Sequence, residues 1–149
     1  MTLVLRGITW DHPRGLQPVV AASADWAQKH DDVHVEWETR SLQAFADEAL
    51  GDLTREYDLI VVDHPQIPRA ARENILVKLD DSHHSAVLRD LALQAVGPSH
   101  ASYACFGHQF ALPIDAAAVV AVSRPDLLPD APVPWEDVLE FSSEGRMVW

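Results

Sequence analysis

The sequence lacks the residues and runs that mark several common classes of protein. It has a single cysteine, Cys105, so no disulfide can form within the chain and no CxxC motif is available to a metal. Its 6 glycines are isolated from one another, which excludes the GxGxxG and Walker A loops that hold phosphates. No apolar run approaches the roughly 18 residues that cross a bilayer, so we expect no membrane insertion.

Basic residues are also scarce. The chain has 11 Lys plus Arg against 23 Asp plus Glu, a net charge of -12. A protein that binds nucleic acid needs a basic face to neutralise phosphates, so we expect no nucleic-acid partner, and an anionic membrane surface is disfavoured for the same reason. What the sequence does have is enough apolar material, 48% of 149 residues, to form a globular core without a structural metal.

The hydrophobic pattern of the first sixty residues alternates between strand and helix. Strands are predicted at residues 3–10, 33–40 and 58–63, and helices at residues 16–30 and 42–56. Helices of this length can serve as crossovers between parallel strands, so we predict an α/β fold with a parallel sheet. Residues 33–40 alternate apolar and polar side chains, which is typical of an edge strand, whereas the apolar run at residues 58–63 predicts a central strand covered on both faces.

The remaining residues predict shorter elements. Helices are expected at residues 69–74, after a cap at Asp81 and Ser82, and at residues 135–141. Extended segments or strands are expected at residues 75–79, 110–113, 116–123 and 146–149.

Polar loops follow the first three predicted strands. Ligands of parallel α/β sheets bind just beyond the carboxyl ends of the strands, so these loops are the candidate binding site. Trp10 offers a flat face for stacking or closes the core, and Arg14 and Arg40 can grip a carboxylate or stay solvated. The candidate ligand-binding residues in these loops are Trp10, Asp11, His12, Arg14, Arg40, Ser41, Asp63 and His64.

The pairs Asp11-His12 and Asp63-His64 leave a second hypothesis open. Two such pairs could hold a divalent metal or supply a base with its orienting carboxylate, as in a cytoplasmic enzyme or ligand sensor. No HExxH motif or nucleophile elbow accompanies them, so we predict no catalytic residue, no metal and no cofactor. A plain interaction domain, with the loops as mere connections, is the third hypothesis.

Motifs along the chain resemble those of bacterial extracellular solute-binding proteins of family 1. Their order and spacing match the family over nearly the whole sequence. The matching segments are residues 7–10, 26–38, 57–63, 110–115, 118–128 and 134–139.

The resemblance implies a type 2 periplasmic-binding-protein-like architecture. Residues 1–115 would form the first α/β lobe, and residues 116–149 a crossover strand and the beginning of a second lobe. It adds Asp115 to the candidate site and implies a non-enzymatic protein that binds a small polar or anionic solute in an interlobe cleft and delivers it to an ABC permease. It also implies a periplasmic or extracytoplasmic location. The first ten residues resemble no secretion signal, which favours the alternative of a cytoplasmic protein or a replaced leader.

Overall fold

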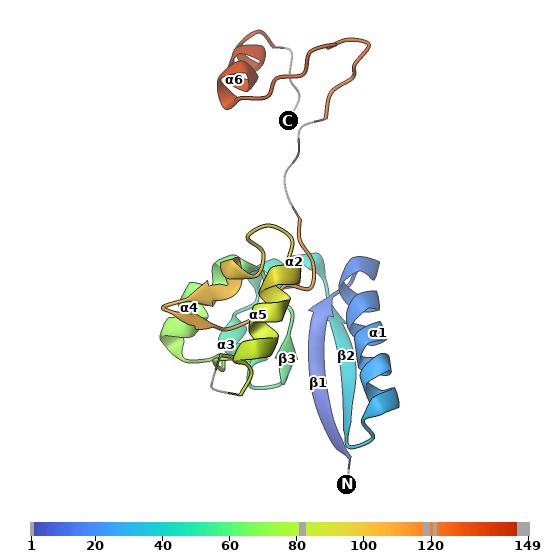
Figure 1. The fold of residues 1–149 in the computed structure, drawn as a ribbon. Coiled ribbons are helices and arrows are strands. Elements are labelled where there is room, and N and C mark those ends of the chain that lie inside the picture. The colour runs from blue at the N-terminus through green and yellow to red at the C-terminus, as the bar shows by residue number, and fades with distance from the viewer. Residues whose placement is uncertain (1, 81–82, 118–119, 121, 146–149) are drawn as a thin grey trace. The chain divides into compact units, whose positions relative to one another are not determined.

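The computed structural model describes residues 2–80, 83–117, 120 and 122–145. The chain divides into two compact units, Met1–Ala116 and Ala117–Trp149 (Figure 1). In the part of the chain that the structure describes, no helix has the length and apolar character needed to cross a membrane.

A parallel sheet of 3 strands organises the first unit, which confirms the predicted α/β class. Strands β1 (Leu3–Trp10) and β2 (Val33–Arg40) pair along their whole length, from Leu3 opposite Val33 to Trp10 opposite Arg40. Strand β3 (Leu59–Ile60) pairs with β1 on its other side. Helix α1 (Pro13–Lys29) connects β1 to β2 and lies along one face of both strands (Figure 1).

The strand order β2-β1-β3 confirms the edge position of β2 but makes β1 the central strand of the described sheet. The prediction that residues 58–63 form a central strand is therefore wrong for this sheet. Only Leu59 and Ile60 have strand geometry, and Leu59 is 39% exposed. The pairing is short because the chain turns into a 3-10 helix, η1 (His64–Gln66), in which Pro65 has no N–H to offer a neighbouring strand.

The predicted helix at residues 42–56 is broken into α2 (Leu42–Asp47) and α3 (Leu50–Leu53). Glu48 and Ala49 are extended, with ψ of 134° and 123°. The break lets Phe45 pack against Trp10, with ring centroids 5.5 Å apart, while Leu50 joins the core cluster. One straight helix would not point both side chains at these separate targets.

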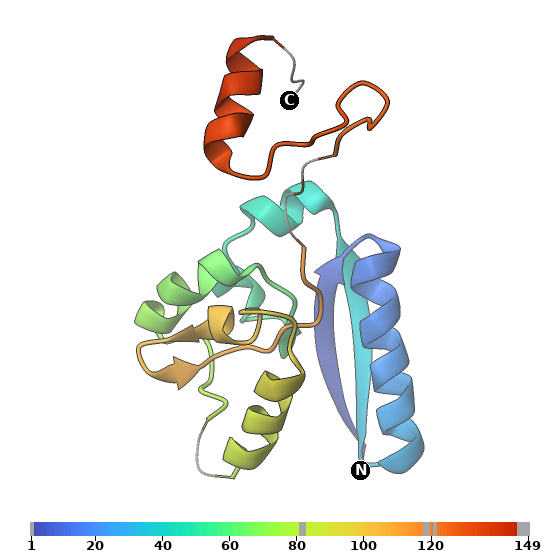
Figure 2. The same ribbon diagram turned by 45° about the horizontal axis from the view of Figure 1, so that its top comes forward.

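The elements that follow β3 complete the first unit. Helices α4 (Ile67–Glu73) and α5 (Ser85–Gln94) are followed by the 3-10 helix η2 (Ala101–Tyr103). The hairpin of β4 (Ala104–Cys105) and β5 (His108–Gln109) was not predicted from the sequence, and it lies beside α4 (Figures 1 and 2). Residues 75–79 and 110–113 form no strand, but the Leu79 N–H donates to the Gln109 carbonyl at 2.8 Å.

Side chains from β1, the short helices and the segment after the hairpin make one core. Ile67 is fully buried at its centre. The buried members are Ile8, Leu50, Leu53, Val62, Ile67, Ala70, Ala71 and Phe110.

In the second unit, α6 (Trp135–Ser143) confirms the helix expected near residue 135. The described residues between 116 and 123 have no strand geometry. The rest of that predicted strand, the predicted cap at Asp81 and Ser82, and the predicted strand at residues 146–149 lie outside the described residues.

Candidate functional site

The candidate site lies at the carboxyl edge of the sheet, where β1 and β3 end. Asp11 and His12 follow β1, and Asp63 and His64 follow β3, which pairs directly with β1. All four side chains are exposed. The structure thus brings both Asp-His pairs to the same edge, as the parallel arrangement predicts.

His12 closes the N-terminus of α1. Its Nδ1 accepts the Arg14 N–H at 3.1 Å, and this bond caps the helix. Pro13 has no N–H, and the N–H groups of Gly15 and Leu16 donate to the His12 carbonyl at 2.9 and 3.0 Å. The N–H groups of this first turn are already used, so an anion at this end of α1 would have to be held by a side chain.

Arg14 and Asp115 join sequence-distant parts of the site. The Arg14 guanidinium on α1 donates to the Asp115 carboxylate, which lies after the hairpin and 101 residues further along the chain. The side chains are 56% and 34% exposed, so the ion pair faces solvent. Of the predicted site residues, these two are the pair that the structure bonds directly to each other through their side chains.

Tyr103 lies at the same edge and is not among the residues predicted from the sequence. Its hydroxyl donates at 3.2 Å to the carbonyl of Val62, two residues after β3, and its ring meets His64 edge-on at 6.4 Å between centroids. Burial raises the pKa of Tyr103, and the negative charges of Asp63 and Asp115 raise it further. Tyr103 therefore shares its electrostatic surroundings with both carboxylates.

A cavity of about 60 Å³ lies next to this tyrosine, between the end of β3 and the segment that leads to Asp115. It is lined by Ile60, Val61, Val62, Tyr103, Ala111, Leu112 and Ile114.

A ligand-free titration tests this arrangement. Because a nearby negative charge disfavours tyrosinate, Asp63→Asn is expected to lower the pKa of Tyr103 part of the way to its ordinary value, with the contribution of burial remaining. The absorbance of tyrosinate near 295 nm would be followed in a Tyr57→Phe background, which leaves Tyr103 as the only tyrosine. Asp25→Asn, near the other end of α1, is the control and should change nothing. Equal titration of Tyr103 with and without Asp63 would contradict the arrangement.

Arg40 and Ser41 are occupied within the fold. The Arg40 side chain is 5% exposed; it donates to the Val61 carbonyl at 3.1 Å and to the Glu48 carboxylate at 3.2 Å. Its guanidinium also lies 4.9 Å from the Phe45 ring centroid. Ser41 caps α2, its Oγ accepting the Ala44 N–H at 3.1 Å. The structure thus buries Arg40 where it bonds to Val61, and it uses the exposed Ser41 to cap α2.

Trp10 is packed rather than freely presented. A Cβ added at Gly15 would lie 2.5 Å from Cδ2 of Trp10, so the ring rests directly on the glycine backbone. Phe45 contacts the ring at a tilt of 51°. Trp10 is therefore half-buried at the end of β1, and its stacking on a ligand stays a prediction.

The two Asp-His pairs do not assemble into a metal site. Among the residues that the structure describes, no group of three or more His, Cys, Asp or Glu side chains is placed to hold a metal ion. Each Asp-His pair is therefore part of its own polar loop, and the two loops lie at the same edge of the sheet.

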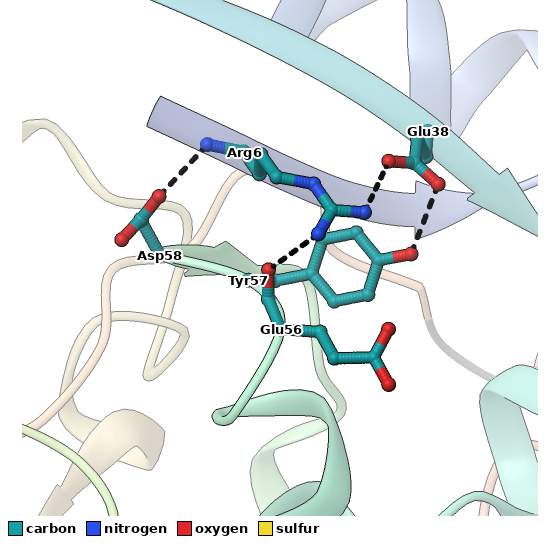
Figure 3. Close-up of polar contacts among 5 residues, drawn as sticks. All are labelled: Arg6, Glu38, Glu56, Tyr57 and Asp58. Atoms are coloured by element: carbon teal, nitrogen blue, oxygen red, sulfur yellow. Dashed lines mark hydrogen bonds and ion pairs between the residues drawn. The ribbon is translucent and has the colours of Figure 1, made fainter. Parts of the chain in front are cut away.

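A second polar cluster crosses the strands nearer their middle (Figure 3). Arg6 on β1 donates to Glu38 on β2 at 2.7 Å, and the Tyr57 hydroxyl donates to the same carboxylate at 3.0 Å. The bond from Arg6, and then that from Tyr57, lowers the pKa of Glu38. Burial and the Glu38 carboxylate raise the pKa of Tyr57. The cluster joins β1 and β2 to the segment before β3.

A larger cavity of about 310 Å³ adjoins this second cluster and lies apart from the strand-end loops. Its lining comes from β1, α3 and the residues around them: Ile8, Glu48, Ala49, Asp52, Leu53, Glu56 and Tyr57. Of its carboxylates, Glu48 pairs with Arg40 and Asp52 with Arg55, so they are engaged within the fold. Size alone does not make this cavity the functional one.

No protein-family model matches the chain, and no curated protein matches it in sequence. Solved structures do resemble it. A cyclo/maltodextrin-binding protein complexed with maltotetraose aligns with a TM-score of 0.58 at 15% identity, over 76% of this chain and 28% of its own. The protein CpMnBP1 with mannotriose bound gives a TM-score of 0.54 at 20% identity, over 75% of this chain and 28% of its own.

The GacH receptor of Streptomyces glaucescens GLA.O, described unliganded and with acarbose, gives a TM-score of 0.56 at 12% identity. The alignment covers 76% of this chain and 29% of the receptor. At these identities the likeness shows the fold, a mixed α/β structure like that of solute-binding proteins. The chain spans less than a third of the length of each of these three structures.

Proposed function

We propose that this chain forms part of a solute-binding protein of an ABC-type uptake system and binds a small polar molecule without transforming it. The single observation that carries the proposal is the convergence at one sheet edge of two exposed Asp-His loops, Tyr103 and the Arg14–Asp115 pair. The fold it shares with binding proteins for oligosaccharides supports it. An ABC permease would be its partner, and its location would be periplasmic or extracytoplasmic.

The proposal divides the predicted site residues by their roles. Asp11, Asp63 and His64 would contact the solute, since their side chains are exposed at the edge. The Arg14 guanidinium and the Asp115 carboxylate would each form hydrogen bonds with solute hydroxyls and weaken the ion pair between them. Both groups are partly exposed at this edge of the sheet.

The remaining predicted residues would support this surface from within. His12 and Ser41 cap α1 and α2, and Trp10 and Arg40 hold the strand ends in place. As in the sequence analysis, residues 1–115 are proposed as the first lobe and residues 116–149 as the start of a second.

A thermal-shift screen followed by calorimetry tests the proposal. The probes are maltotetraose, mannotriose, acarbose, single amino acids, polyamines and small carboxylates. A solute at a hundred times its dissociation constant should raise the free energy of unfolding by about 2.7 kcal/mol. If no probe from any of these classes stabilises the protein, the proposal is overturned.

Loss of one loop carboxylate should weaken the binding of the solute found in that screen. Asp63→Asn removes a charged acceptor, and a hydrogen bond to a charged group contributes about 1.5 to 3 kcal/mol, so the affinity should fall by roughly ten- to a hundredfold. Asp25→Asn keeps the same chemical change near the other end of α1 and should leave the affinity unchanged. Equal affinities for the two variants would place the solute elsewhere.

A further inference from the structure

The Arg14–Asp115 ion pair controls how much positive charge the site can offer. Arg14 and Arg40 are the arginines among the predicted site residues; the Arg40 side chain is 5% exposed and bonded to Glu48. Arg14 is 56% exposed, but its guanidinium already donates to the Asp115 carboxylate. The exposed cation is therefore neutralised by a carboxylate of the same chain.

The other groups at this edge do not restore a positive field. His12 Nδ1 accepts the Arg14 N–H, and the N–H groups of Gly15 and Leu16 donate to the His12 carbonyl, so the first turn of α1 has no N–H left for an anion. Asp11 and Asp63 add further negative charge close by. Tyr103 donates to the Val62 carbonyl and meets His64 edge-on, so it lies beside the loop that carries Asp63. An incoming anion would have to displace Asp115 from Arg14 and then remain next to it.

We infer that Asp115 determines the charge selectivity of the site: by occupying Arg14 it excludes anionic solutes and leaves the site to uncharged or cationic ones. The inference rests on the proposed function and narrows its solute class, because the sequence left both polar and anionic solutes open. It makes Asp115 a specificity residue, because its carboxylate repels anionic solutes and holds Arg14 in an ion pair.

The inference predicts that removing one carboxylate opens the site to anions. Asp115→Asn frees Arg14 and removes a negative charge next to it. An exposed ion pair and one nearby like charge each shift affinity by a few-fold, so citrate should bind the variant about tenfold more tightly than it binds the parent protein. The measurement is calorimetric titration of the full chain with sodium citrate at constant ionic strength.

Two further variants decide where the citrate binds. Asp126→Asn frees Arg124, an exposed arginine that pairs with its own aspartate, and therefore shows what any released surface arginine does. It should gain no citrate affinity. Adding Arg14→Gln to Asp115→Asn should return the affinity to that of the parent protein. The inference is overturned if Asp115→Asn gains nothing, if Asp126→Asn gains as much, or if the double variant keeps the gain.

Mannotriose, maltotetraose and acarbose, titrated into the same variants, separate this inference from the proposed function. Suppose that Asp115→Asn raises the affinity for citrate only when Arg14 is present, and that no solute of the wider screen stabilises the parent protein. That result would support the charge role of Asp115 and reject solute binding. Binding of an uncharged sugar by the parent protein, with citrate bound equally tightly before and after Asp115→Asn, would retain solute binding and reject the charge role.

Discussion

Arg40→Met is expected to lower the free energy of unfolding of the Met1–Ala116 unit by about 3 kcal/mol, because it removes a buried, charged donor from the half-buried Val61 carbonyl and from the Glu48 carboxylate. In the folded chain the guanidinium donates to the Val61 carbonyl at 3.1 Å and to Glu48 at 3.2 Å. Methionine fills much of the same space and offers no N–H. The loss should lower the midpoint of thermal unfolding by roughly 10 °C, measured by circular dichroism.

Arg55→Met is the matched control. Arg55 also pairs with an acidic residue, Asp52, at 3.0 Å, but its side chain is 79% exposed, so water replaces the lost bond and the stability should change by less than about 0.5 kcal/mol. Arg40→Lys should recover only part of the loss, since one ammonium cannot reproduce the planar fork that reaches separate acceptors. Equal stability of the Arg40→Met and Arg55→Met variants would show that Arg40 does not hold the strand ends together.

The elements of the first forty residues could be predicted because local pattern and final packing agree there. The alternation in residues 33–40 gives an edge strand with one face on α1, where Trp37 donates to Ser23 at 2.8 Å. The apolar stripe predicted from residue 16 becomes α1, which begins earlier, at Pro13, because His12 caps it. The common edge for the strand-end loops then follows from parallel pairing alone.

Arg40 shows where sequence reasoning reaches its limit. An arginine after a strand can either bind a ligand or be buried. Which of the two occurs depends on whether other segments of the chain pack over its side chain. Here Phe45 and Val61 do so, from separate elements 5 and 21 residues further along the chain. Their placement depends on the break between α2 and α3, which tertiary packing imposes on a continuous helical pattern.

The hairpin that follows Tyr103 was not predicted, for a different reason. Strands β4 and β5 have 2 residues each, too few for a periodic signal. Their turn places Phe106 and Gly107 at φ of 51° and 79°, a conformation usually announced by Asn-Gly or Asp-Gly. With phenylalanine in the first position, the sequence gives no hairpin signal, and the proximity of Tyr103 to β3 could not be foreseen.

Gly7→Ala is expected to destabilise the sheet by about 3 kcal/mol, because a tryptophan ring already occupies the space that the new methyl group needs. A Cβ at this position would lie 2.5 Å from Cε3 and 2.7 Å from Cζ3 of Trp37. The ring has little freedom to yield, since its Nε1–H is bonded to Ser23 on α1 at 2.8 Å. Either β1 and β2 must separate or α1 must shift, and both alter the strand ends that form the candidate site.

The same argument applies at the site itself, where Gly15→Ala would put a Cβ 2.5 Å from Trp10. Because Trp10 ends β1, we expect a loss of about 2 kcal/mol in urea unfolding and a changed tryptophan emission spectrum. Gly51→Ala in α3 is the control: its nearest neighbour would be Ile75 at 3.9 Å, so the methyl group fits and should stabilise the chain by roughly 0.5 kcal/mol. If all three alanine variants unfold at the same urea concentration, then neither tryptophan rests on a glycine, and the close packing of α1 against β1 and β2 that positions the loops is refuted.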